Sequence, residues 1–453
     1  MLTYWKTHKY PLIFAIASLL FYWSFAYDLH RSDFAKLIGL YAALFFFAYK
    51  ILQFEKGNFE FLVIFGISAR LIFLFATPNL SQDFYRFIWD GKLLLNGVNP
   101  YLFAPDNLIN KDLFATENWQ GLYNGMGPLS AANHSNYPPV NQIFFYLGSL
   151  LGGSSLLGNI ISMRIFIILA DLGILYFGRK ILIWLKLPQH QIFWYFLNPF
   201  ILIELTGNLH FEGVMLFFLV ASMFFILQQK WIVGALLFSL SISVKLLTLV
   251  LLPLFIRWFY HNNTSKKIGT LRLLGFYLVV FLGVCASFLP FVSSEMIQHY
   301  GETIGLWFQK FEFNASIYYL IREFGFYRQG YNIIATAGTR LAILVFLFVL
   351  GMAFFRKNQQ PKTLLVSMLM AVSFYLFLST TVHPWYVATP LLLCVFTNYK
   401  FPIIWSLAVF LSYYSYSNEV FNENLWMVAI EYLLIYAVFL KEVYFEKPIL
   451  KHL

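Results

Sequence analysis

The stretch LLGFYLVVFLGVCASFLPF, residues 273–291, decides the fold class of this chain. It runs for nineteen residues without a charged side chain, and about 20 apolar residues are what an α-helix needs to cross a membrane. Similar stretches recur along the sequence, because 60% of the 453 residues are hydrophobic and only 11% are charged, compared with roughly 25% charged in soluble domains. The sequence therefore predicts an all-α, polytopic integral membrane protein and excludes a soluble enzyme.

Apolar runs bounded by charge, proline or glycine predict about fourteen transmembrane spans. The expected spans are 11–27, 34–50, 59–76, 160–178, 190–204, 211–228, 231–244, 246–258, 270–290, 331–354, 363–379, 384–398, 401–416 and 424–441. If the N-terminus is cytoplasmic, most lysines and arginines fall on the inner side, as the positive-inside rule requires. The net charge of +10 then indicates topology rather than a nucleic-acid partner, and both termini are expected in the cytoplasm.

The predicted topology leaves two long segments outside, 77–159 and 291–330, within a single transmembrane domain that covers 1–453. The first segment is rich in Trp, Tyr, Asn, Pro and Gly, and long ordered loops of this kind are usually functional. Residues 141–157 are apolar but interrupted by glycines, so we expect an interfacial or re-entrant helix there rather than a full span.

Polar side chains gather at the expected outer ends of several spans. Such groups are costly beside lipid and are functional candidates by default. The candidates are Asp83, Asp90, Glu204, Asn208, His210, Glu212, Lys245, His383, Trp385 and Tyr386. Carboxylates, imidazoles and an amine that converge beside lipid indicate chemistry on a polar group attached to a lipid.

Asp83 is the leading candidate for a catalytic group. Partial desolvation raises the pKa of a carboxyl toward neutrality, which suits a general base that acts on a hydroxyl. The structural alternative is an ion pair with Arg86, about one helical turn away. Asp90 would lie on the same helical face, where it could contact a substrate or orient a tight turn expected at Gly91.

Three cations are candidates for contacts with a phosphate. Lys245 could bind a phosphate as a point charge, or its side chain could extend to the membrane interface. Arg322 and Arg328, in the second outer segment, could contact a lipid phosphate or could be ordinary surface charges.

The remaining candidates suit a sugar or an acceptor. His210 and Glu212 could hold a sugar or form part of a metal site, or could simply hydrogen-bond within a polar turn. His383 is a candidate phosphate ligand or proton carrier, whereas Trp385 and Tyr386 beside it could also belong to an interfacial aromatic belt. No cofactor is expected; a divalent metal is left open, but the first outer segment has no Asp-x-Asp pair that would support one.

Three charged residues lie deeper within expected spans: Arg70, Arg164 and Asp171. An unpaired charge would be costly there, so we expect them to include a structural ion pair.

The motif DFYRFIWDG (83–91), followed by NGVNPY (96–101), resembles the first outer loop of GT-C glycosyltransferases. It is most similar to the bacterial polyprenyl-phosphate-mannose-dependent mannosyltransferases. Further matches follow in order and rough spacing: YPP (137–139), NP (198–199), GNLHFE (207–212), SVK (243–245) and HPWY (383–386). The chain departs from the family pattern because it lacks the Asp-x-Asp pair of some members and a large C-terminal outer domain, and because two spans precede the one that leads into the loop.

The resemblance implies a GT-C-like fold in the bacterial plasma membrane and an inverting sugar transfer at its outer face. The donor would be a polyprenyl-phosphate sugar, with mannose the sugar that the resemblance implies, and the acceptor would be a hydroxyl of a glycan, lipid or protein. Asp83 takes the position of the family's catalytic base. Lys245, His383, Arg322 and Arg328 would contact the donor phosphate, while Asp90, Asn208, His210, Glu212, Trp385 and Tyr386 would contact sugar or acceptor.

Two other classes of protein would also use a polar site beside lipid. A flippase or exporter of lipid-linked saccharides would bind without reacting, but transporters of this kind usually show two related halves, and the sequence shows none. An O-antigen ligase or polymerase would also use a large outer loop but lacks these motifs. A sugar-nucleotide donor is disfavoured because the chain has no Gly-rich nucleotide-binding loop.

Overall fold

The computed structural model describes residues 2–114, 116–417 and 421–445, with side chains from residue 8 onward except 307–309. Within these ranges every extended regular element is helical, and the one isolated β-bridge pairs Phe313 with Thr381. Helices are the expected result for an apolar chain, because a helix satisfies all of its backbone hydrogen bonds internally. The predicted all-α fold is confirmed.

Six of the described helical segments are long and apolar enough to cross a membrane. They are His8–Tyr27 in α1 (Leu2–Tyr27), α2 (Phe34–Glu55), α7 (Leu156–Trp184), Lys266–Phe291 in α12 and its extension, α15 (Ile334–Phe355) and α16 (Pro361–Leu378). A seventh arises if the bent pair Ile201–Gly207 and α9 (Glu212–Leu227) counts as one span. Other apolar helices are shorter, so the structure agrees with a membrane protein but does not confirm fourteen spans.

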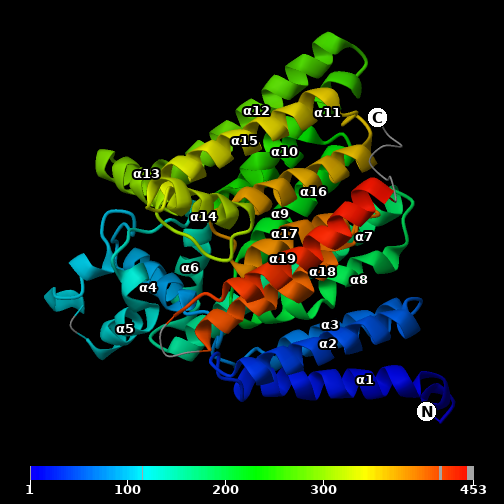
Figure 1. Cartoon of the computed structure of the whole chain (residues 1–453), viewed down its shortest axis with the longest axis horizontal. Helices are drawn as coiled ribbons and strands as arrows, with labels where there is room; N and C mark the ends of the chain where they lie inside the picture. The colour runs from blue at the N-terminus through cyan, green and yellow to red at the C-terminus, as the bar shows by residue number, and fades with distance from the viewer. Residues whose placement is uncertain (1, 115, 418–420, 446–453) are drawn as a thin grey trace.

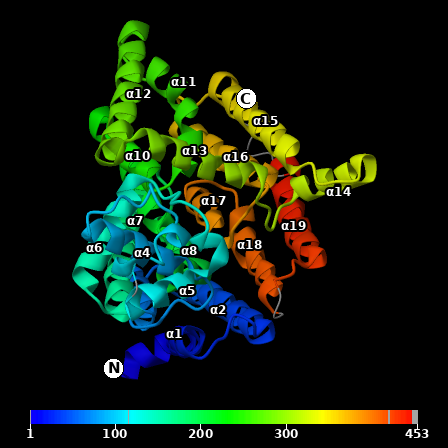
Figure 2. The same ribbon diagram turned by 90° about the vertical axis from the view of Figure 1, so that its left-hand side faces the viewer.

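The long helices run side by side, and the two long polar segments meet at one end of the molecule. In Figure 1 this end lies to the left, whereas α1 begins and α19 (Leu425–Leu440) ends on the right. The left end carries α4 (Asp83–Leu95), α5 (Glu117–Ala131), α6 (Pro139–Gly152), α13 (Ser294–Gln309) and α14 (Ile317–Gln329). Figure 2 views this end directly.

Direct contacts tie the two long segments together. Asn99 Nδ2 donates a hydrogen bond to Phe291 O at 3.1 Å. The rings of His134 and His299 stack at 3.9 Å between centroids. The segments therefore form one layer over this end of the helices.

The helices α9 and α12 differ in how much of their surface is buried, because α9 is central and α12 is peripheral. Twelve of the 16 residues of α9 are buried, whereas only Gly269, Phe276 and Val280 are buried among the 23 residues of α12 (Lys266–Phe288). The many apolar side chains of α12 thus face outward, as they do on a helix whose solvent is lipid.

The helix α4 packs closely against α6. A Cβ atom on Gly91 would lie 2.2 Å from Phe145 O, so only glycine allows this approach. The prediction of a tight turn at Gly91 is wrong, because Gly91 lies inside α4 and serves the contact between the two helices.

A buried ion pair links the third helix to α7, as expected. Arg70 Nε lies 2.9 Å from Asp171 Oδ2, and both side chains are fully buried. The Tyr195 hydroxyl donates to the other carboxylate oxygen at 3.2 Å, and the Arg70 guanidinium lies over the Phe196 ring. Since each charge has a partner, this pair is a structural element between α3 (Phe59–Ile72) and α7.

Candidate functional site

Two cavities of different character meet beside Lys245. The larger has a volume of about 900 Å³ and the smaller about 400 Å³. Both are lined by Asn136, Tyr137, Lys245 and Tyr386. We call the larger the apolar cavity and the smaller the polar cavity.

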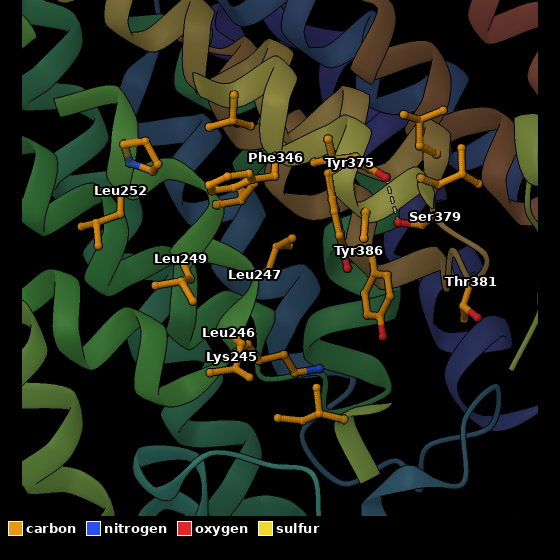
Figure 3. Close-up of a pocket in the computed structure, with 18 of the residues that line it drawn as sticks. Lys245, Leu246, Leu247, Leu249, Leu252, Phe346, Tyr375, Ser379, Thr381 and Tyr386 are labelled. Carbon is orange, nitrogen blue, oxygen red and sulfur yellow. Dashed lines mark hydrogen bonds between the residues drawn. The ribbon is translucent and has the colours of Figure 1, made fainter. Parts of the chain in front are cut away.

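The apolar cavity lies between the 3₁₀ helix Leu246–Phe255 and helices α15 and α16. Its walls are mainly aliphatic and aromatic, with Leu249, Leu252, Val345 and Phe346 among the lining side chains. Figure 3 shows these walls, with the Lys245 nitrogen directed toward the side of Tyr386. A ligand in this cavity would thus contact hydrocarbon side chains along its length and the Lys245 ammonium at one end.

The polar cavity contains Asp83, which is the first residue of α4. Arg31, Arg86, His134 and His383 also line it. Burial raises the pKa of the Asp83 carboxyl to about 6, although the Lys245 cation acts in the opposite direction. A carboxyl with such a pKa is ionised at neutral pH and is more basic than an ordinary aspartate, as a general base requires.

The chain that leads into Asp83 is held from three directions. Leu80 N donates to Asn208 Oδ1 at 3.0 Å, and Leu80 O accepts from Arg31 Nη1 at 3.2 Å. Gln82 Nε2 donates to Met126 O at 3.0 Å. Asn208, predicted to contact substrate, therefore supports the backbone just before the candidate base.

Asp90 lies behind the cavities, in a buried polar network. Arg86 Nε donates to its Oδ1 at 2.8 Å, while Ser135 Oγ and Gln142 Nε2 donate to its Oδ2 at 2.6 and 2.9 Å. Arg86 thus pairs with Asp90, and the alternative pairing with Asp83 is not formed. Asp90 lines neither cavity, so its contacts are those of a structural residue.

Lys245 follows the last turn of α10 (Trp231–Val244), where the backbone becomes extended. Its ammonium forms an ion pair with the buried carboxylate of Glu212. It also lies 5.9 and 6.0 Å from the ring centroids of Tyr137 and Tyr386. Lys245 therefore faces an internal junction, where Glu212 is its ion-pair partner.

The position of Glu212 depends on a sharp break in the chain. The π-helix Ile201–Gly207 and α9 meet at 108°, and Leu209 between them has a positive φ of 62°. The buried Arg164 donates to the carbonyls of Thr206 and Gly207, each at 2.8 Å. Arg164 thus satisfies backbone acceptors that the break exposes, and α9 can begin with Glu212 at the cavity.

Three aromatic rings stack beside the polar cavity. The Trp385 ring stacks with His210, at 3.7 Å between centroids, and with His383, at 4.6 Å. Trp385 and His383 line the cavity, whereas His210 does not. Burial lowers the pKa of His383 to about 3, and the Lys245 cation adds to this effect. His383 would therefore meet a ligand as a neutral imidazole, able to hydrogen-bond but carrying no charge.

The second long segment holds His383 in place. Phe313 N donates to Thr380 O at 3.1 Å, and Val382 N donates to Phe313 O at 2.8 Å. The Phe313 ring lies 5.3 Å from His383. Residues distant in sequence thus position the imidazole.

The predicted site residues divide into three groups. Those that line a cavity are Asp83, Glu212, Lys245, His383, Trp385 and Tyr386. Asp90, Asn208 and His210 are buried and line neither cavity.

The third group lies on α14, outside both cavities. Arg322 pairs with Glu312 at 2.7 Å and with Glu323 at 3.1 Å, and Arg328 lies over the Phe324 ring. The structure does not bring either arginine to the site.

The sequence reasoning missed Arg31 and His134. Arg31 lies in the turn between the first two helices, among ordinary polar residues, and nothing in its spacing relates it to Asp83. His134 lies in the first long segment, outside every motif quoted above. Among the residues with described side chains, no three His, Cys, Asp or Glu converge in a way that could hold a metal ion.

Comparison with known proteins places the site in context. Residues 70–261 match the family model described as alpha-(1->6)-mannopyranosyltransferase, N-terminal domain. The alpha-(1->6)-mannopyranosyltransferase A of Mycobacterium tuberculosis is 23% identical over 205 residues, which are 43% of this chain and 36% of that protein. The protein of the same name from Corynebacterium glutamicum is 22% identical over 207 residues, 44% of this chain and 38% of that protein.

The matches thus span little more than a third of the length of these relatives. They confirm the predicted resemblance to mannosyltransferases. Asp83, Glu212 and Lys245 lie within the matched range 70–261, whereas Arg31 and His383 lie outside it.

Proposed function

We propose that this protein is a membrane mannosyltransferase that uses a polyprenyl-phosphate mannose as donor. One observation carries the proposal: Lys245 lies where an apolar cavity joins a polar cavity that contains a candidate base. A lipid-phosphate sugar has the same order of parts, with a hydrocarbon chain, one phosphate and a polar ring. The relatives named above support mannose as the sugar.

In this proposal the hydrocarbon chain lies in the apolar cavity. Its volume of about 900 Å³ is near the upper end of the range of ligand pockets, roughly 300–1,000 Å³. The lining of leucine, valine and phenylalanine offers contacts without polar groups that would be left unpaired. The donor phosphate then reaches Lys245, which binds it as a point charge in place of, or together with, Glu212.

The transfer follows from the positions of Asp83 and Lys245 in the polar cavity. Asp83 takes the proton of an acceptor hydroxyl, and the hydroxyl oxygen attacks C1 of the mannose. The bond between C1 and the phosphate oxygen breaks, so the lipid phosphate leaves with an additional negative charge. Lys245 stabilises that charge electrostatically, and the neutral His383 can donate a hydrogen bond. Attack from the side opposite the leaving group inverts C1.

We further propose that the site faces outward, with both termini in the cytoplasm. The support comes from the lysines and arginines, which concentrate in the short connections at the other end of the helices. The donor would then be consumed at the outer face of the membrane. The acceptor is a hydroxyl of a glycan, lipid or protein.

The test is a transfer assay with purified protein in nanodiscs, a synthetic polyprenyl-phosphate mannose and an alkyl mannoside as acceptor. Asp83→Asn should lower the rate at least about 100-fold, the usual contribution of a general base. Asp112→Asn is the matched control, because Asp112 is an exposed carboxylate of the same long segment. Full transfer by Asp83→Asn would refute the role of Asp83. If the protein moved a lipid-linked saccharide across the bilayer and formed no transfer product, the alternative function of a flippase or exporter would be favoured.

A further inference from the structure

The turn between α1 and α2 contributes a cation to the polar cavity. Arg31 lines this cavity although it lies in a hairpin that precedes the matched range 70–261. Its guanidinium lies over the Tyr416 ring at 4.1 Å from the centroid, and Nη1 donates to Leu80 O. Stacking and hydrogen bonding hold the planar group in one orientation, which is how arginine presents its remaining N–H donors to a ligand.

Arg31 and Lys245 lie in different parts of the polar cavity. Lys245 lies with Tyr137 and Tyr386, at the boundary that both cavities share. Arg31 lies with Tyr416, and neither of these residues lines the apolar cavity. Asp83 is within electrostatic reach of both cations. If the donor phosphate is at Lys245, the Arg31 side is the part of the cavity left for the second substrate.

The charges around the cavity favour a neutral ligand on the Arg31 side. Lys245 is paired with Glu212, and Arg86 with Asp90. No carboxylate of a described residue lies within ion-pair distance of Arg31, so its charge is offset mainly by that of Asp83 in the same cavity. An anionic acceptor would gain from Arg31 but would lie beside the carboxylate that must be ionised to act.

The lining on this side also suits a sugar. Tyr413, Tyr416, Phe313 and Phe421 line the polar cavity near Arg31 and form ring contacts with one another. Aromatic rings pack against the C–H faces of a sugar, while the guanidinium donates to its hydroxyls. Aromatic area beside a fixed fork of donors is therefore the chemistry of a saccharide subsite.

We propose that Arg31 and Tyr416 form the acceptor subsite, which binds a neutral saccharide and directs one of its hydroxyls toward Asp83. This inference rests on the proposed function, because it takes Asp83 as the base and Lys245 as the contact to the donor. Arg31 acts as a specificity-determining residue, and it reaches the cavity from a part of the chain that the matched range does not include.

The experiment measures donor and acceptor separately, at pH 8, where Asp83 is ionised. Arg31→Gln should raise the KM for an alkyl α-mannoside at least tenfold, as expected for the loss of a hydrogen bond from a charged group, and should change the donor KM less than twofold. Arg31→Lys keeps the charge but loses the planar fork, so it should also raise the acceptor KM. Arg340→Gln, which removes an exposed arginine outside both cavities, is the matched control.

Several outcomes would overturn the subsite. An unchanged acceptor KM in both Arg31 variants would do so, and so would an equal rise in donor KM, which would mean that Arg31 acts by holding the Asp83 segment. An alkyl uronoside carries a carboxylate, so tighter binding of the uronoside than of the mannoside would refute the proposal that the acceptor is a neutral saccharide. Calorimetric binding of the mannoside alone separates the two proposals: binding that depends on Arg31, in a protein that transfers nothing, would refute the proposed function but support the saccharide subsite.

Discussion

The raised pKa of Asp83 leads to a specific dependence of transfer on pH. The proposed base works only when ionised, so activity should be lost as the pH falls through its pKa. With a pKa of about 6, about 90% of the carboxyl is ionised at pH 7 and only about 9% at pH 5. The rate should therefore fall about tenfold between these values. An aspartate with an ordinary pKa near 3.9 would lose less than about 10% over the same interval.

The assay is kcat/KM for the acceptor in nanodiscs between pH 4.5 and 8.5, at saturating donor. Thermal unfolding at each pH serves as the control for loss of folded protein. The acid limb should have its midpoint near pH 6. A rate that stays constant from pH 5 to pH 8 would refute the hypothesis that Asp83 is a general base with a raised pKa.

Variants of two neighbouring charged residues test the direction in which each charge shifts the pKa of Asp83. The Glu212 carboxylate raises the pKa of Asp83, so Glu212→Gln should move the midpoint to lower pH. Arg31 has the opposite influence, so Arg31→Gln should move it to higher pH. Shifts in the reverse directions would contradict the electrostatic account, even if a limb near pH 6 were found.

Three further predictions concern the donor and the fold. Lys245→Met should lower transfer at least about 100-fold by removing charge stabilisation of the leaving phosphate, measured as kcat/KM for the donor. Val345→Trp should fill part of the apolar cavity and raise the donor KM, whereas Leu347→Trp, on the outward side of the same helix, should not. Gly91→Ala should lower the unfolding temperature because the new Cβ meets the α6 backbone. Gly39→Ala, where the space is open, should leave the unfolding temperature unchanged or raise it.

Motif and topology together predicted two residues that the structure places at the polar cavity. Asp83 and Lys245 stood out because charge is scarce near the ends of apolar helices, and both line the polar cavity. Asp90 and Asn208 stood out for the same reason, yet they hold the scaffold in place. Scarcity of charge identifies residues that need a polar environment, but it does not distinguish a buried hydrogen-bond network from an open cavity.

Other features depend on contacts that no local pattern contains. Arg31 reaches the cavity because Tyr416 and Leu80, far away in sequence, hold its guanidinium. Trp385 was expected to contact sugar or acceptor, and in the structure its ring stacks with imidazoles from two different segments. Such arrangements arise only when the helices pack, since each needs side chains from elements distant in the chain.

By itself, the sequence determined that this chain is helical and suited to a membrane, because its apolar stretches can satisfy their backbone only as helices when water is absent. It also determined which few polar groups are available for chemistry. The tertiary structure alone decided how those groups divide between scaffold and cavity, because the break before Glu212 and the packing of the two long segments bring Asp83, Lys245 and Arg31 around one space. Hydrophobicity acts locally along the chain, whereas the position of a charge in a cavity depends on every helix that surrounds it.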